Sequence, residues 1–221
     1  MKKRILIESD EILVQAIDAL TSCEPRFEYV LEHTGMPELR LRPDGFQTLL
    51  QAIVSQQVSV AAANAIWCRL EIENFLDPNR ILKTNDERLN SVGLSRQKIR
   101  YAKALAAADL DYIALRRKSD DEVIRILTEV PGIGVWTAEI YAMFSLKRAD
   151  IFAAGDLALK ESARILFSLG ERPTEGELRQ LSTNWSPWRS VAALILWDYY
   201  SFAKNMNLKF SWLQMTPTKS A

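Results

Sequence analysis

Helical periodicity runs through almost the whole chain and constrains its fold more than any other feature. Apolar residues recur at intervals of three and four, which is the spacing of one face of an α-helix. One such run is Phe46, Leu49, Leu50, Ile53 and Val54. No segment alternates polar and apolar residues for long enough to require a β-strand. The sequence therefore predicts an all-α protein of about ten helices joined by short loops.

Helix-start signals support this interpretation. Ser119 and Thr174 are each followed three residues later by a glutamate, which matches the capping box. Asp44 precedes the helix expected from Phe46 and is its predicted N-cap.

Composition narrows the class of protein. The 221 residues include 28 Lys and Arg against 28 Asp and Glu, with 48% apolar residues. A chain of this kind forms one globular domain or two small ones. Neutrality excludes a globally cationic, histone-like protein. It does not exclude nucleic acid, because a basic face can be balanced by acidic residues elsewhere.

The sequence has few histidines and cysteines to bind a metal and no apolar stretch long enough to cross a membrane. His33 is the single histidine, and Cys23 and Cys68 are the two cysteines, too few for a four-cysteine zinc site or an iron–sulfur cluster. The apolar stretch at 191–197 is shorter than the roughly 20 residues that cross a bilayer. We therefore expect no catalytic metal, no membrane association and an intracellular location.

Two glycines mark the most informative segment, residues 130–139. A helix expected over about 121–128 ends before Gly132 and Gly134, and a new helix begins at about Val135. Glycines allow positive φ and close backbone approach to a ligand. The free N–H groups of the new helix would face an anion such as phosphate. An ordinary connection between two helices explains the same glycines equally well.

Asp156 begins another helix with apolar periodicity. The simplest interpretation is an N-cap. A helix N-terminus also stabilises an ionised carboxylate, which suits an acid that must stay negative beside developing positive charge.

The hairpin and this aspartate together carry a resemblance. Residues 131–138, Pro-Gly-Ile-Gly-Val-Trp-Thr-Ala, with Asp156 twenty residues after Trp136, resemble the helix-hairpin-helix DNA glycosylase superfamily. That resemblance implies an all-α, two-lobed fold. Lobe one would cover about 46–154, including the hairpin at 130–136, and lobe two about 1–45 plus 155–221.

Three further segments are similar to that superfamily. Residues 46–59 resemble the stretch before and across the loop that enters DNA, and Gly93-Leu-Ser-x-x-Lys98 its second backbone-contacting loop. Residues 185–190 with Trp197 resemble the C-terminal helix of the 3-methyladenine DNA glycosylase II branch. The resemblance extends over about residues 25–202.

The resemblance implies base excision from double-stranded DNA that contains a damaged base. The enzyme would flip the damaged nucleotide into a pocket and hydrolyse its N-glycosidic bond. Asp156 matches the essential aspartate, which would stabilise the oxocarbenium-like sugar, or orient or deprotonate water. Gly132 and Gly134 match the phosphate-holding hairpin, where family members often bind a monovalent cation through main-chain carbonyls. Gln57 matches the residue that fills the gap left by the flipped base.

Trp136 stands where relatives that also cut the strand carry a Schiff-base lysine. The resemblance therefore implies a monofunctional glycosylase without lyase activity and without a cofactor. Trp136 and Trp197 match aromatic pocket positions, where an indole would attract a cationic alkylpurine. Core packing of both tryptophans is the alternative. The pocket tyrosine of the family falls on Ile140, with Tyr141 adjacent, so Tyr141 is the candidate.

Candidate phosphate contacts are Arg96, Lys98 and Lys147, each of which is equally explained as a solvated surface charge. We expect a monomer that acts on the genome, in the cytoplasm at a bacterial nucleoid or in a eukaryotic nucleus. Two other functions stay open. One is a glycosylase for a different damaged base, and the other is a helix-hairpin-helix DNA-binding protein without catalysis.

Overall fold

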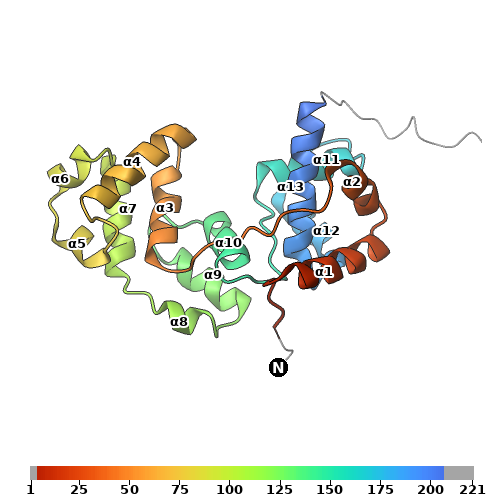
Figure 1. The fold of residues 1–221 in the computed structure, drawn as a ribbon, viewed down its shortest axis with the longest axis horizontal. Helices are drawn as coiled ribbons and strands as arrows, with labels where there is room; N and C mark the ends of the chain where they lie inside the picture. The colour runs from red at the N-terminus through yellow and green to blue at the C-terminus, as the bar shows by residue number, and fades with distance from the viewer. Residues whose placement is uncertain (1–3, 207–221) are drawn as a thin grey trace, which may run out of the picture. The chain divides into compact units, whose positions relative to one another are not determined.

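The computed structural model describes residues 4–206. Within that range it contains thirteen α-helices and one short 3-10 helix, and its β-structure is limited to an antiparallel bridge between Leu6 and Arg148 (Figure 1). The expected all-α fold is confirmed. Among these helices none combines the length and the apolarity that crossing a membrane requires.

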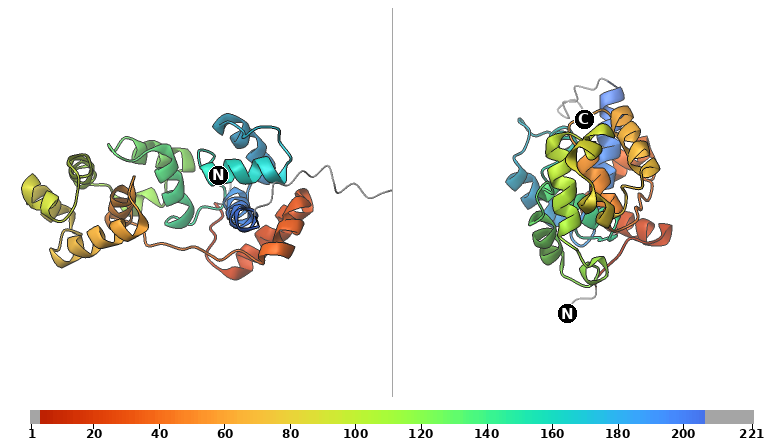
Figure 2. Two further views of the ribbon diagram at one scale, coloured as in Figure 1. Left: turned by 90° about the horizontal axis from the view of Figure 1, so that it is seen from above. Right: turned by 90° about the vertical axis from the view of Figure 1, so that its left-hand side faces the viewer.

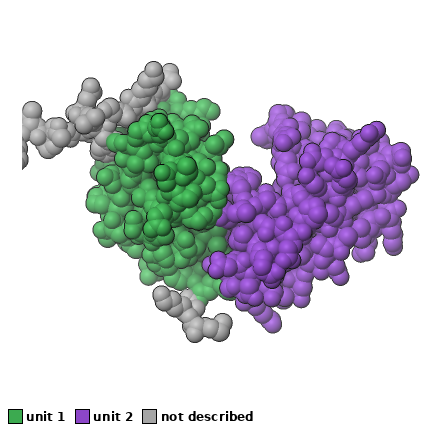
Figure 3. Space-filling model, turned by 180° about the vertical axis from the view of Figure 1, so that it is seen from behind, with its two compact units in different colours: residues 1–40, 147–221 green, residues 41–146 purple. Residues whose placement is uncertain are grey.

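The chain divides into two compact units (Figure 3). Unit 1 joins residues 1–40 with 147–221, and unit 2 is the continuous stretch 41–146. The chain returns to unit 1 at Lys147, earlier than the boundary that the sequence predicts near residue 154. The cause is backbone pairing of the returning chain with the N-terminal segment, because Ile7 N donates to Lys147 O at 2.8 Å and Ala149 N to Ile5 O at 3.2 Å.

Unit 1 is built around its last helix. Its elements are α1 (Asp10–Cys23), α2 (Arg26–Thr34), α11 (Leu157–Leu166), α12 (Glu175–Ser182), the 3-10 helix η1 (Thr183–Trp185) and α13 (Arg189–Asn205). Helix α13 packs against α1, α2 and α11, and Figure 2 (left) shows it nearly end-on, with α1 and α2 on one side and α11 on the other. Residues 190–196 of α13 are all buried, so this helix forms the core of the unit.

Unit 2 carries the other helices. They are α3 (Phe46–Ser55), α4 (Val60–Ile72), α5 (Pro78–Lys83), α6 (Asp86–Ser91), α7 (Arg96–Ala107), α8 (Tyr112–Leu115), α9 (Asp120–Thr128) and α10 (Val135–Phe144). Helix α3 packs against α4, α7 and α10, and its apolar face, including Leu50 and Ile53, is fully buried. Helices α9 and α10 form the hairpin and pack against each other.

The predicted capping boxes at Ser119 and Thr174 are confirmed at the starts of α9 and α12.

The predicted N-cap at Asp44 is wrong. Gly45 occupies that position with a φ of 113°, and no side chain caps α3. The Asp44 carboxylate instead accepts two hydrogen bonds from Arg116, at 2.6 and 2.9 Å. A bidentate ion pair with a residue 72 positions away leaves no local sequence signal.

Candidate functional site

Asp156 is the N-cap of α11, and its side chain is held by three donors. Oδ1 accepts from the backbone N–H groups of Ala158 at 2.8 Å and Leu159 at 3.1 Å. The indole Nε1 of Trp197 donates to the same oxygen at 3.1 Å. These contacts fix the direction of the carboxylate, so the same residue both caps the helix and presents an oriented acid.

Trp197 reaches Asp156 because α13, which carries it, packs against α11. Its side chain is half-buried. The sequence favours an aromatic pocket wall or a core residue at position 197, and neither interpretation includes a hydrogen bond to the aspartate. The two residues are 41 positions apart in the chain, which explains why no local sequence pattern reveals this pair.

The hairpin turns between Thr128, where α9 ends, and Val135, where α10 begins. Gly132 has a φ of 95°, and a Cβ placed there would lie 2.4 Å from Cγ of Tyr101, so both conformation and packing require glycine. Gly134 is the exposed N-cap of α10 and brings no side-chain cap. The first N–H groups of α10 have no intrahelical partner, and such groups suit an anion.

The main-chain carbonyls of the two hairpin glycines already accept hydrogen bonds. Gly132 O accepts from Gln56 Nε2 at 2.9 Å, and Gly134 O accepts from Ala138 N at 3.0 Å. A monovalent cation at these oxygens would have to share them through the second lone pair of each. No group of His, Cys, Asp and Glu within residues 4–206 is arranged to hold a metal ion.

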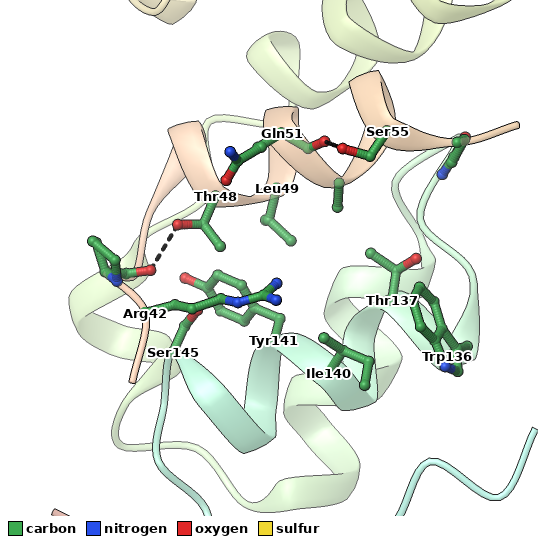
Figure 4. A pocket seen from close by; sticks show the side chains of 13 residues that line it. Arg42, Thr48, Leu49, Gln51, Ser55, Trp136, Thr137, Ile140, Tyr141 and Ser145 are labelled. Carbon is green, nitrogen blue, oxygen red and sulfur yellow. Dashed lines mark hydrogen bonds between the residues drawn. The ribbon is translucent and has the colours of Figure 1, made fainter. Parts of the chain in front are cut away.

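A pocket of about 580 Å³ lies between α3 and α10 in unit 2 (Figure 4). Its volume falls within the range of small-molecule sites. Helix α3 contributes Thr48, Leu49, Gln51, Ala52 and Ser55, followed by Gln56. From α10 and its C-cap come Trp136, Thr137, Ile140, Tyr141 and Ser145, and Arg42 and Pro43 complete the lining.

Two of the three predicted pocket aromatics line this cavity. Trp136 exposes 47% of its surface beside the pocket, so it is not a core residue. Tyr141 is only 3% exposed, and its hydroxyl accepts a hydrogen bond from Gly45 N at 2.8 Å. Burial raises the pKa of Tyr141, which keeps the phenol neutral. Trp197 belongs to unit 1 and Trp136 and Tyr141 to unit 2.

Polar groups that the sequence did not single out also line the pocket. Ser145 is 7% exposed, and its hydroxyl has no hydrogen-bond partner within the described part of the chain. Thr137 is also buried. The Arg42 guanidinium lies 5.7 Å from the centroid of the Phe144 ring, and Figure 4 shows the Arg42 side chain extending into the pocket, where it crosses the Tyr141 ring in this view. The lining thus combines apolar walls with hydrogen-bond donors, which suit the polar edge of a bound aromatic ring.

Gln57 lies in the loop between α3 and α4, residues 56–59. Its φ is 56°, a left-handed conformation that is uncommon for residues other than glycine. Gln57 is exposed, and its neighbour Val58 exposes 39% of its surface. A polar and an apolar side chain therefore stand together at the tip of this loop.

The three predicted phosphate contacts lie in different environments. Arg96 is exposed at the first position of α7. Lys98 is only 8% exposed, and its ammonium donates to Val54 O at 2.6 Å, so the structure does not bring this charge to the surface. Burial lowers the pKa of Lys98. Lys147 lies in unit 1 and forms an ion pair with Glu8 at 3.3 Å.

Known proteins are similar to this chain in sequence and in fold. The family described as HhH-GPD superfamily base excision DNA repair protein matches residues 50–187. The alkylbase DNA glycosidase-like protein mag2 of Schizosaccharomyces pombe is 30% identical over 191 residues, which cover 81% of this chain and 90% of that protein.

Two solved structures extend the likeness to three dimensions. A DNA-3-methyladenine glycosidase from Bacillus halodurans superposes with a TM-score of 0.77 at 33% identity, over 91% of this chain and 94% of that one. The 3-methyladenine DNA glycosylase Mag1 of Schizosaccharomyces pombe, in complex with abasic DNA, gives a TM-score of 0.72 at 28% identity, over 89% and 100% of the two chains.

Proposed function

The chain belongs to the HhH-GPD superfamily of base excision DNA repair proteins, and we propose that it is a DNA glycosylase that removes alkylated purines such as 3-methyladenine from double-stranded DNA. The oriented carboxylate of Asp156 carries this proposal. Binding a phosphate would not require an acid held by three donors, whereas hydrolysis of a glycosidic bond uses one. The names of the similar proteins support the alkylpurine class.

The reaction breaks the bond between C1′ of the deoxyribose and the purine nitrogen. The bonding electron pair leaves with the base, which neutralises the positive charge that alkylation placed on the ring. Positive charge then develops on C1′ and the ring oxygen of the sugar, where a fixed carboxylate lowers its energy. Water adds to C1′, and its proton passes to the carboxylate or to solvent.

The indole of Trp136 favours the proposal that the substrate base is cationic. The face of an indole attracts a cation by about 0.5–2 kcal/mol, so an alkylated purine gains over its neutral parent base. Because alkylation also weakens the glycosidic bond, modest help from the protein suffices. The hairpin amides would hold a backbone phosphate, and Gln57 would fill the gap in the duplex.

Replacing Asp156 with asparagine tests the catalytic role. We expect Asp156→Asn to abolish release of 3-methyladenine from methylated DNA, because the amide carries no charge opposite the sugar cation. Binding of abasic-site DNA should survive, since the amide oxygen still accepts from Ala158 and Leu159 and caps α11. Chromatography of released bases and a binding titration measure the two properties.

Full base release by the Asp156→Asn protein would remove Asp156 from the mechanism.

A panel of duplexes with different lesions separates the alternative functions. Release only of an oxidised or deaminated base would assign a different damage class, and the donors of Arg42, Thr137 and Ser145 in the pocket are the reason to include such neutral bases. Tight DNA binding without release of any base would favour the non-catalytic alternative.

We also propose that the enzyme lacks lyase activity. An indole cannot form an imine with the C1′ aldehyde of an abasic sugar, and Trp136 stands at the position of the lysine that does so. Borohydride reduction during turnover should therefore trap no covalent protein–DNA adduct, and the abasic strand should stay intact until heated in alkali. A trapped adduct would contradict this assignment and would direct attention to Lys160, one turn beyond Asp156.

A further inference from the structure

The loop at residues 56–59 holds Gln57 in a conformation that the chain does not favour by itself. A left-handed φ of 56° at a non-glycine residue persists only where the surroundings fix it. Gln57 is exposed, so its own side chain is not packed into the protein. The contacts that fix this conformation must come from its neighbours.

Gln56 forms one of these contacts. Its side chain is half-buried, and Nε2 donates to Gly132 O in the hairpin at 2.9 Å. The two residues are 76 positions apart in the chain. This hydrogen bond joins the loop to the hairpin directly, at the residue immediately before Gln57.

Lys98 forms the second contact, with the last turn of α3 just before the loop. Helix α3 ends at Ser55, so Val54 O is one of the carbonyls that the end of a helix leaves without an intrahelical partner. The Lys98 ammonium donates to this oxygen at 2.6 Å and is buried in doing so. The buried Lys98 ammonium therefore holds the end of α3 in place, just before the loop begins.

Helix α7 supports the hairpin as well as the loop. Tyr101 lies three residues after Lys98 on α7, so the two side chains share a face of the helix. The Tyr101 ring packs on Gly132 so closely that a Cβ there would lie 2.4 Å from Cγ. Helix α7 therefore contacts both the end of α3, just before the loop, and the hairpin, and Gln56 joins the loop to the hairpin directly.

We propose that Gln56 is a positioning residue that couples the α3–α4 loop to the hairpin, so that Gln57 enters the duplex at a fixed distance from the phosphate that the hairpin holds. This inference rests on the proposed function. Flipping a base leaves an unstacked gap. A residue whose backbone is already fixed in the required conformation loses less freedom when its side chain fills that gap than a residue in a mobile loop does.

A double-mutant cycle tests the coupling. The variants are Gln56→Ala, Gln57→Ala and the double variant, and the measurement is the ratio of affinities for abasic-site and undamaged duplexes. Abasic DNA has no base to occupy the pocket that Gln56 also lines, so this ratio reports on gap filling. We expect each single variant to lower the ratio about 5-fold and the double variant to lower it no further than Gln57→Ala alone.

Two further variants exclude a general loss of structure. Gln56→Glu keeps the side-chain size but removes the donor, and it should behave as Gln56→Ala. Gln97→Ala removes a glutamine whose amide donates within α7 to the Tyr101 hydroxyl at 2.8 Å, and the ratio should stay at the wild-type value. The thermal midpoints of all variants should lie close together.

The outcomes separate this inference from the proposed function. Additive losses in the cycle, or a wild-type ratio in Gln56→Glu, would overturn the coupling even if the enzyme releases alkylated bases. Failure of the wild-type protein to release any base would overturn the proposed function, while a non-additive cycle on abasic DNA would still support the coupling.

Discussion

One oxygen of the Asp156 carboxylate both caps a helix and belongs to the group to which we assign the chemistry. Oδ1 of Asp156 accepts the two backbone N–H groups that a helix N-cap satisfies, and it also accepts the Trp197 indole. The cap alone would stabilise α11 by about 1 kcal/mol. The third donor adds direction, because an acid that acts on a sugar cation must point at it before the reaction begins.

Replacing Trp197 with phenylalanine isolates the third donor. Trp197→Phe keeps an aromatic ring but loses Nε1, and a hydrogen bond to a charged group contributes about 1.5–3 kcal/mol. We expect kcat for base release to fall about 10- to 100-fold, with little change in the affinity for abasic DNA. Single-turnover kinetics and a binding titration measure the two. A loss of affinity equal to the loss of rate would indicate that the residue acts as a binding surface.

The hairpin shows at the scale of elements that two neighbouring glycines serve different purposes. Gly132 is required by its positive φ and by the Tyr101 ring beside it. Gly134 has an ordinary extended conformation, with a φ of −87°, and within residues 4–206 no group beyond its chain neighbours lies within 4 Å of the position that a Cβ would take there. Its place at the exposed start of α10 points to the close approach of a ligand rather than to backbone geometry.

Alanine substitution should separate these two purposes. Gly132→Ala should lower the free energy of unfolding by about 1–3 kcal/mol, because it forces a strained φ and displaces Tyr101. Gly134→Ala should leave stability nearly unchanged and weaken DNA binding. Denaturant unfolding and a DNA titration test the pair. Equal destabilisation by both variants would refute the distinction.

The net charge of the protein gives no indication of DNA binding, yet unit 2 carries exposed cations. The 28 basic residues equal the 28 acidic ones. Arg96 and Arg100 on α7 are exposed and form no ion pair with any residue in 4–206. Other arginines are neutralised locally, as Arg88 is by Glu73. The free cations, rather than the total, determine how strongly a phosphate backbone is attracted.

DNA affinity should therefore depend steeply on salt. If the protein makes four phosphate contacts, raising the salt from roughly 50 to 200 mM weakens DNA binding about 100-fold. Arg96→Ala should reduce the slope of log Kd against log salt by about 0.9, since one contact releases about one counterion. Arg88→Ala, at a paired arginine, is the matched control and should leave the slope unchanged. A wild-type slope near zero would contradict phosphate-directed binding.

Local sequence patterns are enough to predict the helical class, the capping boxes, the hairpin and the aspartate after it. Each of these depends on residues within a few positions of one another, where periodicity and capping chemistry act. Only the tertiary structure showed that Asp44 pairs with Arg116 instead of capping α3, that Lys98 is buried against α3, and that Trp197 donates to Asp156. Those partners lie 41 to 72 positions apart. Packing of helices brings such side chains together, and local patterns contain no record of which helices will pack.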